Sequence, residues 1–177
     1  MLIPFKNGME IGMETTFNDL KQKHLKLVET QWKLREGLQD KAGVLLEEYA
    51  DSLSLPAKTW TDAEGGERSY VEIGVLTAQG KFEAVPLPRL QMDNDYVLHF
   101  VIATTLDDTK MTGGYRHGVS ISLQYSGPFL YASVGSGEDS TSFQVSSRPG
   151  GFFEVCGAIK QLINIGLERL TPTATRF

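Results

Sequence analysis

Residues on one helical face recur at intervals of three and four along the first third of the chain. These residues are Phe17, Leu20, His24, Leu27, Val28, Trp32, Leu38, Ala42, Leu45, Tyr49 and Leu53. Thr16 and Asp19 form a weak capping-box pattern at the start, and Pro56 marks the end. The spacing therefore predicts one long amphipathic helix, or two helices, within residues 15–54.

The length of this predicted helix conflicts with the size of the domain. Unbroken from residue 16 to residue 52, it would be about 55 Å long at 1.5 Å per residue. A compact domain of 177 residues has a diameter of about 40 Å. Two interpretations remove the conflict. Either the helix breaks at Gly37 or Gly43, or it extends past the sheet and pairs with a second copy of the chain as a homodimer.

From residue 68 onward, apolar and polar residues alternate, which is typical of β-strands with one buried face. The alternation is clearest from Val119 to Tyr125, where the intervening residues are Ser, Ser and Gln. Turns rich in Gly separate the segments, and turns this short favour an antiparallel meander. The predicted strands cover residues 68–77, 80–86, 95–106, 116–126, 128–135 and 140–147.

The run from Asn94 to Thr105 is the richest in β-branched and aromatic residues, and we predict that it forms the central strand. Its even positions, from Tyr96 to Ile102, are strongly apolar. Its odd positions, which include His99, are smaller or less apolar. One face of this strand should therefore meet the main core.

The remaining segments complete the predicted architecture. Residues 1–14 are expected to form a hairpin around Asn7-Gly8 or a tail, and the polar residues 59–68 are expected to form a loop. A second apolar stripe predicts a C-terminal helix over residues 151–170. The order of elements predicts one α+β domain over residues 1–177. Its six-stranded, mainly antiparallel meander sheet spans residues 68–147, and both helices pack on one face.

Composition narrows the classes of function. The net charge of −5 and the pI near 5.2 argue against nucleic-acid binding and weakly favour a basic partner. A single cysteine fits a reducing compartment. The sequence has no signal-peptide pattern and no apolar run long enough to span a bilayer, so we expect a cytoplasmic protein that does not bind membranes.

Catalytic and metal-binding patterns are absent from the sequence. The three histidines are far apart, which gives no metal-ligand spacing. Cys156 lies on the apolar stripe of the C-terminal helix and is expected to be an inert core residue. The sequence also contains no nucleophile elbow and no phosphate-binding loop. We therefore expect no enzymatic activity, no cofactor and no metal.

The segment 112–118 is the most informative cluster of polar residues. Between its glycines it combines the aromatic ring of Tyr115, the bidentate guanidinium of Arg116 and the titratable imidazole of His117. In a simple meander, the 107–115 loop and the turns at 78–80 and 136–140 emerge at one end of the sheet. The candidate residues at this end are Asp107, Asp108, Tyr115, Arg116, His117, Glu138 and Asp139. They are interpreted as a binding site for a partner or a small polar ligand, or alternatively as a solvated loop region.

The outer face of the sheet is the second candidate surface. Its predicted residues are uncharged and rich in hydroxyl groups: Ser120, Ser122, Gln124, Ser133, Ser142, Gln144 and Ser146. A face with few charges has a low desolvation cost, so another protein can cover it. The alternative is an ordinary solvated sheet face.

Three hypotheses of function follow from these surfaces. The first is a small protein-binding module, an inhibitor or immunity-type protein that blocks a partner macromolecule. The second is a binder of a small polar or anionic ligand, or an enzyme, that uses Tyr115, Arg116 and His117. The third is a structural subunit that self-associates through its first helix.

Overall fold

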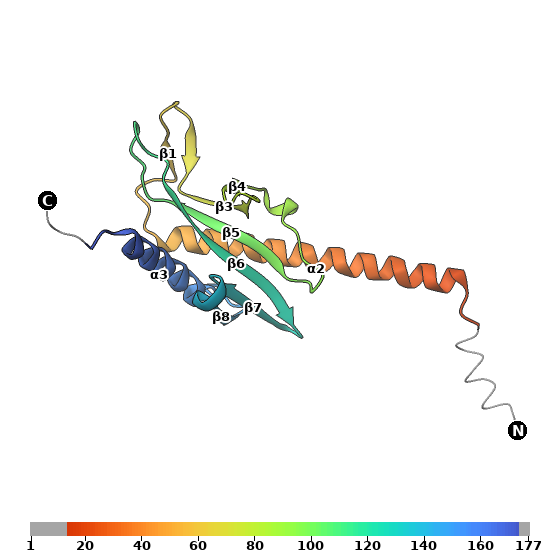
Figure 1. Ribbon diagram of the computed structural model, residues 1–177. Helices are drawn as coiled ribbons and strands as arrows, with labels where there is room; N and C mark the ends of the chain where they lie inside the picture. The colour runs from red at the N-terminus through yellow and green to blue at the C-terminus, as the bar shows by residue number, and fades with distance from the viewer. Residues whose placement is uncertain (1–13, 174–177) are drawn as a thin grey trace, which may run out of the picture. The chain divides into compact units, whose positions relative to one another are not determined.

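The computed structural model describes residues 14–173 and confirms the α+β class (Figure 1). The expected N-terminal hairpin or tail lies outside the described residues. The described residues fall into two compact units, which meet in sequence between Arg35 and Glu36.

Helix α2 is a single α-helix, Phe17–Ser52, so neither Gly37 nor Gly43 breaks it. The capping box predicted from the sequence is present at its start. The hydroxyl of Thr16 accepts a hydrogen bond from the Asp19 amide at 3.2 Å, and the Asp19 carboxylate accepts one from the Thr16 amide at 3.0 Å. The Thr16 amide and hydroxyl also hold the pKa of Asp19 below its usual value.

The second unit contains a six-stranded antiparallel sheet in the order β4-β3-β5-β6-β7-β8 (Figure 1). Its strands are β3 (Val71–Leu76), β4 (Phe82–Ala84), β5 (Leu98–Thr105), β6 (Arg116–Ser126), β7 (Phe129–Val134) and β8 (Thr141–Val145). The four strands from β5 to β8 follow the predicted meander. All of the predicted strands are therefore present, with shorter bounds for most of them.

The sheet differs from a simple meander at β4, which lies on the outer side of β3. As a result, β3 pairs directly with β5 in antiparallel orientation, with Val71 opposite Thr104. The turn at 78–80 therefore emerges at the opposite end of the sheet from the 107–115 loop, and the prediction that they share one end is wrong. The connection after β4 is long enough to cross β3 and reach the start of β5 on its other side. It includes the short helix η1 (Leu87–Arg89), and it is held to α2 by Gln39, whose amide donates to the carbonyl of Leu90 at 2.9 Å.

A second, two-stranded sheet replaces the loop expected at residues 59–68. Strands β1 (Thr59–Thr61) and β2 (Glu67–Ser69) pair in antiparallel orientation. The Asp62 carboxylate closes the turn by accepting hydrogen bonds from the amides of Glu64 and Gly66 at 3.0 and 2.8 Å. A side chain that satisfies the turn amides makes such a short hairpin possible in a polar segment.

Strand β5 begins at Leu98, three residues later than predicted. Asp93 forms an Asx-type turn before it, since its Oδ1 accepts hydrogen bonds from the amides of Asp95 and Val97 at 2.8 and 3.0 Å. Tyr96 consequently adopts a φ of 62°, which is incompatible with a strand. The aromatic residue that resembled the start of the strand is therefore part of a turn.

Both helices pack on one face of the large sheet, as predicted. Tyr49 of α2 is hydrogen-bonded to Thr104 at 2.8 Å. Helix α3 (Phe153–Leu170) contacts β6, β7 and β8, and the space at its Gly166 is occupied by the ring of His117. Thr104 and His117 are opposite each other in the β5–β6 register, so they share a face. The core lies between this face and the helices, and includes Leu38, Leu45, Ile102, Leu123, Val134 and Ile159.

Glu48 joins the two helices. The N-cap residue of α3, Phe152, provides no side-chain acceptor for the helix amides. Instead, the Glu48 carboxylate of α2 accepts hydrogen bonds from the amides of Gly150 and Phe152 at 2.8 and 3.0 Å. A carboxylate at a helix N-terminus also interacts favourably with the helix dipole.

Candidate binding surface

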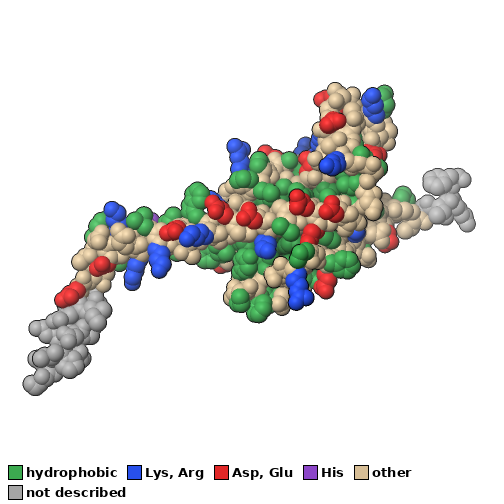
Figure 2. Space-filling view, turned by 180° about the vertical axis from the view of Figure 1, so that it is seen from behind, with side chains coloured by type: hydrophobic (Ala, Val, Ile, Leu, Met, Phe, Trp, Pro, Cys, Tyr) green, Lys and Arg blue, Asp and Glu red, His purple; other side chains and the backbone are tan. Residues whose placement is uncertain are grey.

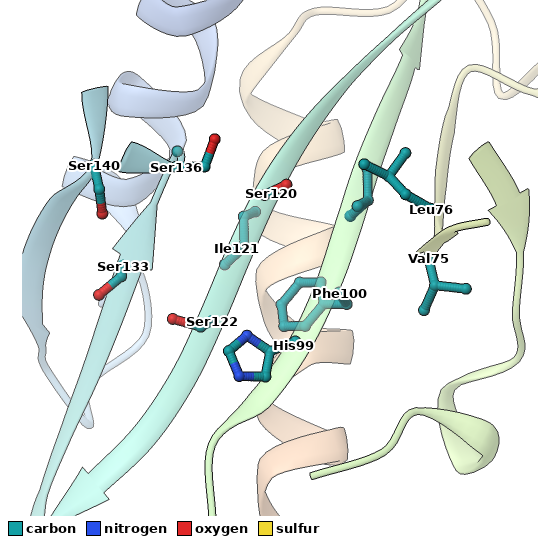
Figure 3. A pocket seen from close by; sticks show the side chains of 12 residues that line it. Val75, Leu76, His99, Phe100, Ser120, Ile121, Ser122, Ser133, Ser136 and Ser140 are labelled. Carbon is teal, nitrogen blue, oxygen red and sulfur yellow. The ribbon is translucent and has the colours of Figure 1, made fainter. Parts of the chain in front are cut away.

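The open face of the sheet is the face that neither helix covers. Alternation along β6 places Val119, Ile121 and Leu123 in the core, so Ser120 and Ser122 point to the opposite side. A pocket of about 550 Å³ lies on this face, within the range of ligand sites. Its serines are Ser120, Ser122, Ser133, Ser136 and Ser140. Figure 3 shows this pocket, which we call the serine trough, with a helix behind the sheet.

One row of side chains crosses four strands of the open face. His99, Ser122, Ser133 and Ser142 are register partners on β5, β6, β7 and β8. The hydroxyls of Ser133 and Ser142 are hydrogen-bonded at 2.7 Å. The next row consists of Gln124, Tyr131 and Gln144. Both rows lack Lys, Arg, Asp and Glu, which agrees with the predicted composition of this face.

Asp93 holds the imidazole of His99 in place at the rim of the serine trough. The distance from His99 Nε2 to Asp93 Oδ2 is 2.7 Å. The hydrogen bond from His99 is the largest cause that lowers the pKa of Asp93, and the Val97 amide adds to it. When Nε2 donates to the carboxylate, Nδ1 is an acceptor for a donor group on a ligand. His99 is therefore an oriented polar contact at the edge of an uncharged pocket.

Replacing His99 with alanine is expected to raise the pKa of Asp93 toward its ordinary value of 3.8, because the largest lowering interaction is lost. An NMR titration of the side-chain carboxyl carbons measures this change. The depressed pKa contributes stability above pH 3.8 that is lost as the pH falls through the folded-state pKa, and this contribution should shrink in the variant.

Asp107 is the matched control for this titration. Its pKa is lowered by hydrogen bonds from Thr109, which do not involve His99, so it should not change in the variant. An unchanged pKa for Asp93 would contradict the assigned pairing.

Charged residues cover the other end of the open face. Arg116 Nη1 lies 3.4 Å from Glu72 Oε1, and its guanidinium lies over the ring of Phe82, 5.0 Å from the centroid. Glu72 is opposite Ala103 and Arg116 is opposite Thr105, so this pair passes over β5. The open face thus has one ionic end and one uncharged end, and the serine trough lies at the uncharged end.

The structure separates the residues of the predicted loop cluster. Arg116 and His117 are neighbours in β6, so Arg116 lies on the open face while His117 lies against α3. Asp108 accepts a hydrogen bond from the Tyr70 hydroxyl at 2.6 Å, and Asp139 pairs with Arg169 of α3 at 3.2 Å. The other three residues are Asp107, which accepts from the Thr109 amide, and the exposed Tyr115 and Glu138. The residues of the cluster that make these contacts therefore point to the open face, to α3 and to Tyr70.

Sequence analysis missed several residues that shape the serine trough. Val75 and Leu76 form its wall on the β3 side. Asp93 orients His99, although its sequence position suggested only a turn at the strand end. The one available signal was the Asp-rich segment before β5, which favours an Asx-turn with a side chain next to the strand.

Other side chains offer less for chemistry. Burial is the largest cause that raises the pKa of the Cys156 thiol, to about 11, which fits the predicted inert role. Within residues 14–173, no three His, Cys, Asp or Glu side chains are grouped to hold a metal ion. In the same range, no helix has the length and apolar character needed to cross a membrane.

No family model matches the chain, and no curated protein or solved structure matches it either. The serine trough can be compared with the charged surface elsewhere on the molecule. Figure 2 shows the molecule from behind, where acidic and basic side chains are spread over the surface. The serine trough differs from that surface because His99 is the only titratable residue among those that line it.

Proposed function

We propose that this protein is a binding module, an inhibitor or immunity-type protein, that blocks a partner macromolecule by holding it on the open face of its sheet. The observation that carries the proposal is the serine trough, an uncharged concavity of about 550 Å³ on a sheet face that both helices leave open. The proposed activity is binding, without a catalytic step.

The chemistry of the trough supports a partner with few charges at the point of contact. Serine hydroxyls both donate and accept hydrogen bonds, so they are satisfied by peptide groups or by polar side chains. The lining contains no Lys, Arg, Asp or Glu that would have to be desolvated or neutralised. Buried interface cores are likewise depleted of charged residues.

The extent of the surface supports a macromolecule over a small compound. Beyond the trough, the open face continues through Gln124, Tyr131 and Gln144 to Phe129, whose side chain is half exposed. Aromatic residues are enriched at protein interfaces, where they supply large rigid contact areas. A partner that covers both the trough and this row would contact five neighbouring strands, β3, β5, β6, β7 and β8.

Replacing Ser122 with arginine tests the proposal, because a long charged side chain would fill the trough and add a charge to desolvate. The full-length tagged protein would be used to recover partners quantitatively from extracts of its own cells. We expect a stoichiometric partner with the wild type and about a tenfold loss with Ser122→Arg, equivalent to about 1.4 kcal/mol.

Gln161→Arg is the matched control, since it makes the same charge change at an exposed position of α3, on the covered side of the sheet. It should recover the partner as the wild type does. Equal recovery with Ser122→Arg, or no stoichiometric partner for the wild type, would contradict the proposal.

A small polar ligand is the second candidate function, because the trough volume suits one and His99 is oriented at the rim. The protein-free fraction of the same extract distinguishes the two candidates. A small ligand would raise the melting temperature of the wild type and not that of Ser122→Arg.

A further inference from the structure

The first unit carries large hydrophobic side chains that are exposed to solvent. Along the described part of its helix, Phe17 is 80 % exposed, Leu20 58 %, Leu27 49 % and Trp32 55 %. Single exposed hydrophobic residues are normal, but a contiguous set on one helix marks an interaction surface.

Three of these residues, Phe17, Leu20 and Leu27, have the spacing of a helix-pairing seam, whereas Trp32 lies outside it. At 100° per residue, Phe17, Leu20 and Leu27 project from one face of α2, with His24 between them. Lys21 and Lys23 project from the two borders of this face. In coiled-coil terms, the lysines occupy the flanking positions that select the charge of a partner helix. We call Phe17, Leu20, Leu27, Lys21 and Lys23 the seam.

We propose that the seam binds an amphipathic helix of a partner protein that carries acidic residues beside its apolar stripe. Lys21 and Lys23 would pair with these acids while Phe17, Leu20 and Leu27 pack on the stripe. Lys33 is not counted among the lysines that would pair with the partner, because its Nζ already lies 3.0 Å from Glu29 Oε1.

Charge disfavours a second copy of this chain as the occupant. The positions that flank the seam along the described helix are Thr16, Lys21, Lys23, Val28, Thr30 and Arg35. None of them is acidic, so self-pairing supplies no opposite charge in either a parallel or an antiparallel arrangement.

Charge also disfavours an anionic membrane surface. Residues 1–35 contain six basic and four acidic residues, a net charge of +2. Residues 36–177 contain eleven basic and eighteen acidic residues, a net charge of −7. The net charge of +2 on residues 1–35 is smaller than the clusters of about four to eight Lys or Arg residues by which proteins bind anionic bilayers. The basic character is therefore local to the unit that contains the seam, which suits a protein partner with an acidic helix.

Two designed helical peptides test this inference on the full-length chain. Both have leucine along one stripe, and their flanking positions are all Glu in one peptide and all Lys in the other. Fluorescence anisotropy measures the binding of each. We expect the Glu peptide to bind about tenfold or more tightly than the Lys peptide, and its affinity to fall as salt is added.

Variants of the seam make the test specific. Leu20→Gln with Leu27→Gln removes the apolar stripe with good helix formers, and should abolish binding of the Glu peptide. Lys21→Glu with Lys23→Glu should reverse the preference toward the Lys peptide. Lys26→Glu changes charge on the opposite side of the helix and should keep the preference for the Glu peptide. Circular dichroism of each variant verifies that the helix is retained.

Three results would overturn the inference. Equal binding of both peptides would mean unspecific hydrophobic contact. A dimer in sedimentation experiments that Leu20→Gln with Leu27→Gln dissociates would assign the seam to a second copy. Co-sedimentation with phosphatidylcholine–phosphatidylserine vesicles, without binding of the Glu peptide, would assign it to a membrane surface.

Discussion

Replacing Tyr49 with alanine is expected to lower the free energy of unfolding by about 4 kcal/mol, because truncation of a large buried aromatic side chain leaves a cavity. Tyr49 is fully buried and is among the largest such side chains in the core. The change also removes the hydroxyl that is hydrogen-bonded to Thr104, which is itself buried. Denaturation in urea, followed by circular dichroism, measures the loss.

Two variants separate the contributions to this effect. Tyr49→Phe keeps the ring and loses only the hydroxyl, so about 1 kcal/mol is expected. Phe153→Ala truncates an aromatic side chain that is almost fully exposed on α3, and should change the stability by no more than about 0.5 kcal/mol. A loss for Tyr49→Ala no larger than that for Tyr49→Phe would show that α2 is not packed on the sheet through this residue.

Replacing Gly74 with alanine is expected to lower the free energy of unfolding by about 3 kcal/mol. Gly74 is opposite Ala84 in the β3–β4 register, and a Cβ atom at this position would overlap the backbone carbonyl of Glu83. Backbone atoms cannot rotate away as a side chain does, so β4 would have to separate from β3. Urea denaturation measures the loss of stability, and hydrogen exchange at the β4 amides locates it.

Gly157 provides a control with the opposite sign. It lies within α3, and nothing occupies the space where its Cβ would be. Gly157→Ala should therefore stabilise the protein by about 1 kcal/mol, because alanine is the better helix former. If Gly74→Ala were as stable as the wild type, β4 would not be closely paired with β3 as described.

Local patterns predicted the elements of the fold because each of them has one buried face. In β6, the alternation of Val119, Ile121 and Leu123 with serines is reproduced by their burial. The stripe of Leu38, Leu45 and Tyr49 likewise faces the core. The periodicity of side chains along a helix or a strand is fixed by the local backbone, so the buried face can be predicted without knowledge of distant contacts.

Strand order depended on contacts that no local pattern contains. The sequence of β4 is compatible with a place on either side of β3. Its position at the edge follows from the return of the chain through η1 and from the contact of Gln39 with Leu90. These contacts join segments that are distant in sequence, so the order of the strands and the position of the 78–80 turn could not be derived.

The candidate surfaces also divide into features that local patterns predict and features that depend on contacts between distant segments. The serines of the open face were predicted because alternation assigns each residue of a strand to one side. The structure places two members of the loop cluster, Arg116 and His117, on opposite faces of the sheet, because they are consecutive residues of β6. The pairing of Asp93 with His99 was missed because it depends on the Asx-turn that replaces the predicted start of the strand.

The capping of α3 by Glu48 has a consequence for the order in which the chain assembles. The amides of Gly150 and Phe152, which immediately precede α3, receive their acceptor from Glu48, a residue 102 and 104 positions earlier, so this end of the helix is capped only once α2 has docked. During synthesis from the N-terminus, Glu48 is made before residues 150–152, so its carboxylate is solvated until that segment docks. Because Glu48 and the capped segment come from opposite ends of the second unit, this contact forms only when both of its helices are in place, and it couples the docking of the last helix to that of the first.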